Sequence, residues 1–247
     1  MFVISLNLAH KLLPCVSTEE TRYYLNGVGV HLLEHGARLI ATDGHILGVF
    51  RDHEAHGTHD GIAIVSRLAI ADAFKAARKE ARRNDPSSYW LVVDDTGMGS
   101  AVLAPTASDA VAGRDDGEEY PVLWRSLKSV LIDGSFPDYT RVIPSRAFDV
   151  TPCDCGFNPA LIGRFASIIN DAKDATRGVS LISTCAKGDG PYLVLSAFVP
   201  DFVGVVMPMR NGTVDAATLV ATARDVLDRP AAALEFIAAK IAKRVDA

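Results

Sequence analysis

Cysteine is scarce in this chain, with four residues among 247. Cys153 and Cys155 are separated by a single residue, which is not a spacing that zinc sites ordinarily use. We therefore expect no metal site at these cysteines. The thiols fit a protein kept in a reducing compartment, where disulfides are uncommon.

Long apolar runs are also missing. No stretch approaches the ~20 apolar residues of a membrane-spanning helix. Residues 1–6 look like an opening strand, because they lack the basic start and the long apolar run of a signal peptide. We expect a cytoplasmic protein that has no membrane partner.

Charge of one sign is not in strong excess. The formal net charge is −5 and the isoelectric point is about 5.8, which argues against a protein that coats DNA by bulk positive charge. A local basic stripe on an acidic body is still compatible with DNA binding. With 49% apolar residues, the chain can bury one large core or two smaller ones.

Strand-like and helical patterns follow one another in a regular order. Alternating apolar residues predict strands at 2–6, 22–33, 38–42, 45–50, 62–65, 89–93, 100–104, 123–132, 148–150, 179–184, 192–197 and 202–207. Helical spacing predicts helices at 7–13, 67–83 and 158–170, the first of them capped by Asn7. Asp43-Gly44 predicts a tight hairpin, and residues 106–119 predict a polar loop.

The order strand, helix, several strands occurs three times, starting near Phe2, Ile62 and Phe148. Such runs of strands with isolated helices predict an α+β fold with antiparallel sheets and helices on one face. After residue 210 the sequence becomes rich in alanine and predicts a C-terminal helical appendix, with helices at 214–227 and 230–245.

Four short segments resemble, in sequence and in order, the bacterial sliding clamp, which is the beta subunit of DNA polymerase III. They are TRYYLNG at 21–27, IATDGH at 40–45, FPDYTRVIP at 136–144 and VVMPMR at 205–210. The resemblance implies a DNA-clamp fold. The chain would then hold a complete clamp-like domain at 1–144, similar to the middle domain of the family, a half domain at 145–210, and a helical extension at 211–247.

The same resemblance implies a processivity factor without catalytic activity, without a metal and without a cofactor. It would tether a DNA polymerase or another DNA-processing partner to duplex DNA, whatever the DNA sequence. Partners would dock a short peptide in a hydrophobic cleft. By position in the four segments, the cleft residues would be Leu25, Thr42, Gly44, His45, Leu47, Pro137, Arg141, Val142, Val205, Met207, Pro208, Met209 and Arg210. Clamps of this family close a ring around DNA from repeated units, and each strand, helix, several-strands stretch of this chain is one such unit. Since three units cannot close a ring alone, we expect a homo-oligomer, with a clamp loader as a further partner.

A basic stripe on the predicted helix 67–83 is a candidate for contact with DNA phosphates. Lysine and arginine recur there at offsets that share one helical face, at Lys75, Arg78, Lys79, Arg82 and Arg83. Lys11, Arg164 and Lys173 are further candidates. Such contacts bind the backbone without reading bases, as a sliding protein requires. A solvated amphipathic face is the alternative interpretation.

Two other functions stay open at this point. The chain could be a clamp-derived module that forms no ring and holds clamp-binding peptides as a regulator or decoy. It could also be a metal-dependent hydrolase that uses the histidine-rich loop 53–59. That loop has the spacing HExH rather than the HExxH that places two imidazoles on one helical face.

Overall fold

The computed structural model describes residues 1–80, 89–113, 117, 119–143, 155–170, 177–184 and 190–209. Several predictions lie outside these residues. They concern the strand at 148–150, the helices at 214–227 and 230–245, the residues Arg82, Arg83, Lys173 and Arg210, and the boundary between residues 144 and 145.

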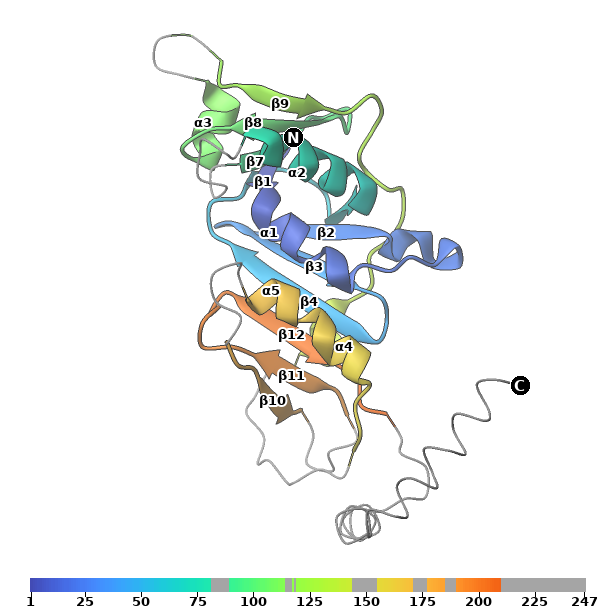
Figure 1. Ribbon diagram of the computed structural model, residues 1–247. Helices are drawn as coiled ribbons and strands as arrows, with labels where there is room; N and C mark the ends of the chain where they lie inside the picture. Colours follow the sequence, from blue (N-terminus) through green and yellow to red (C-terminus); the bar gives the residue numbers. More distant parts are fainter. Residues whose placement is uncertain are drawn as a thin grey trace, which may run out of the picture.

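Two antiparallel sheets form the framework (Figure 1). The smaller has the order β5-β1-β7-β8-β9 and the larger the order β10-β11-β12-β4-β3-β2-β6. The strands are β1 (Phe2–Ser5), β2 (Gly27–Leu32), β3 (Ala37–Thr42), β4 (Ile46–Asp52), β5 (His56–Gly57), β6 (Ile62–Ser66), β7 (Tyr89–Val93), β8 (Gly99–Leu103), β9 (Val122–Arg125), β10 (Ser180–Ser183), β11 (Tyr192–Leu195) and β12 (Phe202–Val206).

The helix predicted at 7–13 ends at Lys11, and the helix predicted at 158–170 is divided into two short helices. The helices are α1 (Leu6–Lys11), the 3-10 turns η1 (Leu13–Cys15), η2 (Glu20–Leu25) and η4 (Tyr139–Val142), and α2 (Arg67–Glu80), α3 (Ala107–Ala112), α4 (Pro159–Arg164) and α5 (Ala166–Ile169). None of the helices in the described part of the chain combines the length and the apolar character that a membrane crossing requires.

Four local predictions were wrong. The strand predicted at 123–132 ends at Arg125, as β9. Ser5, not Asn7, caps α1, because its side chain accepts a hydrogen bond from the Leu8 amide. Residues 20–25 form η2 rather than the start of a strand. The predicted loop 106–119 contains α3, which Thr106 and Asp109 start with a reciprocal capping box.

The first strands of the first two units are exchanged between the sheets. β1 pairs with β7 of the second unit, while β6 pairs with β2 of the first. The third unit adds β10, β11 and β12 to the sheet of the first unit, because β12 pairs with β4 over five residue pairs from Phe202↔Phe50 to Val206↔Ile46. We call this pairing the seam, since it joins strands about 150 residues apart in the sequence.

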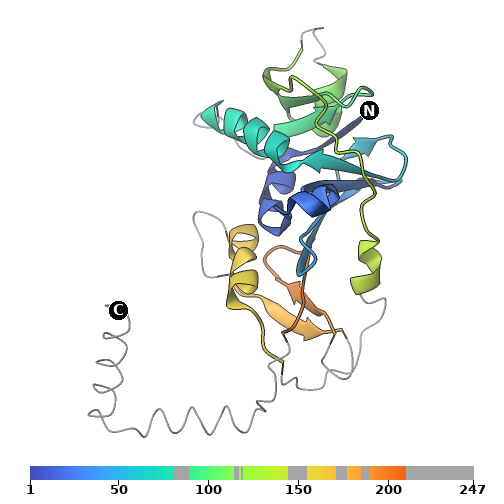
Figure 2. The same ribbon diagram turned by 90° about the vertical axis from the view of Figure 1, so that its right-hand side faces the viewer.

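The predicted placement of the helices on one face is confirmed for α1, α2, α4 and α5. Figure 2 shows them on one side of the sheets, while the segment that leads into η4 runs along the other side. The main core fills the space between these helices and both sheets. The exception is α3, whose Ala107 packs with Val3 and Trp90 on the opposite face of the five-stranded sheet.

Candidate functional site

The seam brings together apolar residues from two of the four segments that the sequence singled out, 21–27 and 205–210, with Leu47, which follows the segment 40–45 by two residues. Val205 on β12 lies opposite Leu47 on β4, which in turn lies opposite Thr42 on β3. Leu25, from the end of η2, joins Leu47 and Val205 in one cluster. We call Leu25, Leu47 and Val205 the floor of the site.

Residues 132–143, here called the strap, cover this floor. Phe136 and Tyr139 of the strap are buried in the same cluster, and Val142 packs against it. As a result the three floor residues are only 2–4% exposed. The floor is therefore a packed surface under the strap rather than an open cleft. Three predicted cleft residues lie on the strap. Of these, Val142 is half-buried, whereas Pro137 and Arg141 face solvent.

Beside the floor, the predicted residues at the ends of β3, β4 and β12 form an accessible rim. It consists of Thr42, Gly44, His45, Met207, Pro208 and Met209, whereas Arg210 lies outside the described residues. Two backbone hydrogen bonds fix the chain there, from the Met207 amide to the His45 carbonyl at 3.0 Å and from the Met209 amide to the Gly156 carbonyl at 2.8 Å. The side chains of Met207 and Met209 nevertheless remain 37% and 50% exposed.

The turn between β3 and β4 is held by one carboxylate. Asp43 accepts hydrogen bonds from the amides of His45 at 2.8 Å and Ile46 at 3.0 Å, and it forms an ion pair with Arg164 at the end of α4. Burial alone would raise the pKa of the Asp43 carboxyl, but these bonds hold that pKa below its ordinary value. Arg164, predicted as a possible DNA contact, thus joins the third unit to the turn of the first.

Gly44 provides the backbone conformation that this turn needs. Its φ angle is +93°, a region that favours glycine, and a Cβ atom there would lie 2.7 Å from a nitrogen of the Arg22 guanidinium. Arg22 itself is bound to Glu19 at 2.6 Å. The segment around residues 21–27 is therefore held close to the hairpin, as the grouping of the four segments requires.

A cavity of about 430 Å³ lies further along the same sheet face. Val49 and Val203, which are paired across the seam, form its apolar side together with Ile143 and Pro200. Arg38 and Arg51 line it as well, and they face one another across β3 and β4. None of these residues was predicted as a site residue. The sequence held the signal, because a hairpin that pairs Thr42 with Leu47 must also pair Arg38 with Arg51.

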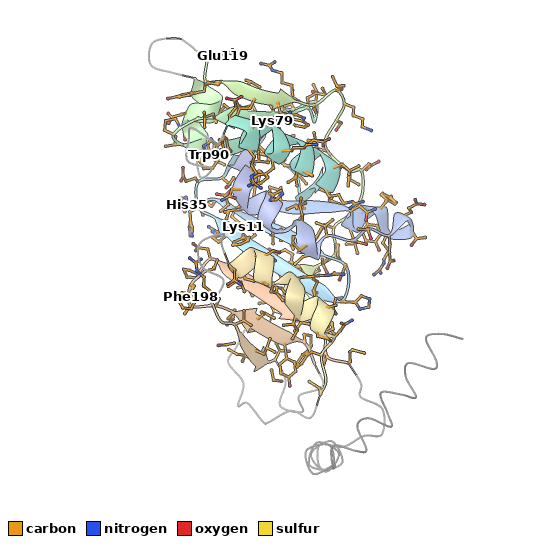
Figure 3. All side chains as sticks on the ribbon, in the orientation of Figure 1. Lys11, His35, Lys79, Trp90, Glu119 and Phe198 are labelled. Atoms are coloured by element: carbon orange, nitrogen blue, oxygen red, sulfur yellow. The ribbon has the colours of Figure 1, made fainter. Side chains whose placement is uncertain are left out.

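The basic stripe on α2 is exposed where the structure describes it. Lys75, Arg78 and Lys79 all face solvent, on the side of the sheets that the helices cover (Figure 2). Figure 3 labels Lys79 on α2 and Lys11 on the neighbouring α1. His10 stacks on Phe74 of α2, with ring centroids 3.7 Å apart. Burial, and then the charge of Arg78, lower the pKa of His10, so its imidazole is neutral at neutral pH.

The histidines of the loop 53–59 do not converge. His53 bonds to Asp201 at 2.9 Å, the His56 ring contacts the Glu54 carbonyl at 3.0 Å, and His59 packs edge-on against Phe2. Within the described residues, no group of three histidine, cysteine, aspartate or glutamate side chains could hold a metal ion. This geometry gives the hydrolase hypothesis no support.

The sequence of the chain is similar to those of known sliding clamps. No family model matches the chain. The beta sliding clamp of Caulobacter vibrioides is 32% identical over 182 residues, which make up 71% of this chain and 41% of that protein. The chain is a relative of the bacterial beta sliding clamp. It spans less than half the length of this curated relative.

Solved clamp structures share the fold. A sliding clamp from Bartonella birtlesii, bound to griselimycin, matches with a TM-score of 0.53 and 20% identity, over 85% of this chain and 66% of the other. DNA polymerase III subunit beta from Borrelia burgdorferi, in complex with a natural product, matches with a TM-score of 0.55 and 12% identity, over 86% and 65% of the two chains. The chain therefore has the DNA-clamp fold expected from its four clamp-like segments.

Proposed function

We propose that this clamp relative is a processivity factor, which tethers a DNA polymerase or another DNA-processing protein to duplex DNA and catalyses no reaction. One observation carries the proposal. Three segments separated by many residues, with Leu25, Leu47 and Val205, meet at the seam and are bordered by the exposed Met207 and Met209. Flexible, polarizable methionine side chains on a fixed backbone suit a surface that accepts several partner peptides.

The accessible part of the proposed peptide site is the rim, because the strap covers the floor. A partner peptide would lay an apolar side chain against Met207 and Met209, with the His45 imidazole and the exposed Arg141 guanidinium as polar neighbours. Deeper insertion over Leu47 would require Val142 to move. A small peptide would then dock on the rim alone, whereas a larger peptide would also displace the strap.

The helix-covered side would face DNA. Lys75, Arg78 and Lys79 present three positive charges on exposed positions of α2, and contacts of this kind bind phosphates without sequence preference. The overall charge of −5 limits bulk attraction to DNA, so retention would rest on the stripe and on assembly around the duplex. A protein with this role would act in the cytoplasm.

A homo-oligomer would complete the assembly, because both sheets end in edge strands, β9 and β10. Next to β9 lies a cavity of about 700 Å³, which Leu68, Trp124 and Leu127 help to line. Leu127 is 100% exposed and Leu68 is 64% exposed. At the seam the outermost strands of two units, β4 and β12, already pair with each other. In the same way, β9 of one copy would pair with an edge strand of another copy. A monomer at all concentrations would favour the module that forms no ring.

We propose griselimycin, which the Bartonella birtlesii clamp binds, as the ligand with which to test the rim. Isothermal titration calorimetry would measure its affinity for the native chain and for Met207→Ala and His45→Ala. We expect each substitution to weaken binding by about tenfold, equivalent to loss of about 1.4 kcal/mol of contact energy.

The matched control is Phe198→Ala. Phe198 is a large apolar residue that is 61% exposed, and Figure 3 places it well away from the rim. Its variant should bind griselimycin like the native chain. Equal affinity of all four proteins, or no binding to the native chain, would refute the assignment of the peptide site to the rim.

A further inference from the structure

The strongest feature outside the proposed rim is the pair of arginines at the cavity under η4. Arg38 and Arg51 lie directly opposite one another on β3 and β4. Cross-strand neighbours of this kind have Cβ atoms about 5 Å apart, and like charges in such pairs destabilise the sheet. Two arginines at opposed positions that line one cavity therefore favour an anion that contacts both.

Hydrogen bonds fix both guanidinium groups in place. Arg38 donates to the Tyr139 hydroxyl at 3.1 Å, and that hydroxyl contacts His31 Nδ1 at 2.9 Å. Arg51 donates to the His35 carbonyl. These acceptors are neutral, and within the described residues neither arginine forms an ion pair with a carboxylate. The positive charge of the pair is therefore oriented, and among the described residues no direct ion pair neutralises it.

Apolar side chains line the cavity together with the polar residues Tyr139, Thr140 and Asp201, and the apolar part decides which anion fits. Val49, Val203, Ile143 and Pro200 line it next to the two arginines, within a volume of about 430 Å³. A DNA phosphate would gain nothing from these walls, whereas a carboxylate that sits beside an apolar side chain would use both parts. Planar guanidinium groups also match the geometry of a carboxylate.

We propose that this cavity binds an acidic residue of a partner peptide, together with an apolar residue next to it. The inference rests on the proposed function, because it assigns a second anchor point to the peptide that docks at the rim. The distance is suitable. The rim residue Met207 follows the cavity residue Val203 by four positions in the chain, which is roughly 13 Å in an extended strand, so a partner peptide of about five extended residues would reach both.

Asp201 allows a substitution whose effect on binding should be opposite to that of the arginine substitutions. Its carboxylate lines the same cavity and bonds to the exposed His53 at 2.9 Å. The negative charge of Asp201 opposes an incoming carboxylate. Neutralising Asp201 should therefore strengthen binding, whereas neutralising either arginine should weaken it.

The probes are the blocked peptides acetyl-Phe-Glu-Leu-amide and acetyl-Phe-Gln-Leu-amide. Titration followed by NMR of the backbone amides of residues 49–51 and 201–203 would measure both affinities. We expect the glutamate peptide to bind about tenfold more tightly, as charge-assisted hydrogen bonds to arginine predict. Arg38→Gln and Arg51→Gln should each remove most of this preference, and Asp201→Asn should increase it. Arg125→Gln, a change at the exposed arginine that ends β9 in the other sheet, should leave it unchanged.

Three results would overturn the proposal. They are equal affinity for the two peptides, a preference that survives both arginine substitutions, and a short duplex oligonucleotide that shifts the same amide signals and displaces the peptide. The last result would assign the arginine pair to DNA phosphates. Griselimycin binding to the same variants separates the two proposals, because binding that persists in Arg38→Gln and Arg51→Gln leaves the rim assignment intact.

Discussion

Removal of one aromatic ring at the seam should destabilise the whole chain and not the third unit alone. Phe202 is 1% exposed and lies opposite Phe50 of the first unit, with ring centroids 5.0 Å apart. Its ring also lies 6.0 Å from Phe165, at the start of α5. Phe202 therefore contacts both parts that the seam joins.

Phe202→Ala removes this ring from a packed core, which typically costs about 3–5 kcal/mol of unfolding free energy. With a urea m-value of about 3 kcal/mol/M, a loss of about 3 kcal/mol would lower the unfolding midpoint by about 1 M. Phe198→Ala is the control, because Phe198 belongs to the same unit but is 61% exposed. We expect that variant to stay within about 0.5 kcal/mol of the native chain.

Tryptophan fluorescence makes the assay specific. The chain contains two tryptophans, Trp90 on β7 and Trp124 on β9, and both belong to the five-stranded sheet. If the sheets unfold as one cooperative unit, the fluorescence midpoint of Phe202→Ala must fall together with the midpoint measured by circular dichroism. An unchanged fluorescence midpoint would refute the reasoning, since the third unit would then unfold on its own.

Three further predictions concern charge and burial. Neutralising the exposed stripe with Lys75→Ala, Arg78→Ala and Lys79→Ala should weaken binding to duplex DNA and lower the slope of log affinity against log salt by about 2.7, in a titration from low to high salt. Asp43→Asn should lower stability at pH 7 by about 1–3 kcal/mol, and the difference in urea unfolding should disappear at acid pH. The reason is that a carboxyl with a depressed folded pKa contributes stability that is fully present above its unfolded pKa and is lost as the pH falls through its folded pKa. Cys15 is fully buried, and burial, followed by the charge of Asp43, raises the pKa of its thiol to about 12. Mass spectrometry after iodoacetamide treatment of the native chain should therefore find Cys15 unmodified.

Local patterns predicted the elements well where the chemistry of a few neighbouring residues decides the structure. Asp43-Gly44 fixed the hairpin and hence the register of β3 and β4. The apolar face of α2 carries Ile70, Ala73 and Ala77, which are buried as helical spacing requires. The helix α3 was missed, although Thr106 and Asp109 form a capping box that the sequence displays. The small and polar residues of this segment favoured a loop, although the capping box indicated the start of a helix.

The site was harder to predict because it depends on contacts between distant parts of the chain. The pairing of β4 with β12 brings Leu47 opposite Val205, and no local pattern in either strand specifies that partner. The strap is a second example. Gly29 leaves room on β2 for the Phe136 ring, which a Cβ atom would approach to 3.1 Å, so the strap packs onto the sheet and buries the floor. Sequence alone therefore grouped the right segments without predicting which of their side chains stay accessible.

Retention on circular DNA tests the clamp function most directly. The chain would be incubated with nicked circular duplex DNA and passed over a sizing column, at a salt concentration that disrupts simple phosphate contacts. The circle would then be cut once. The account predicts that the chain stays with the circle and is released from the linear product. Equal loss from circular and linear DNA would contradict it, because a protein held only by contacts does not distinguish the two forms.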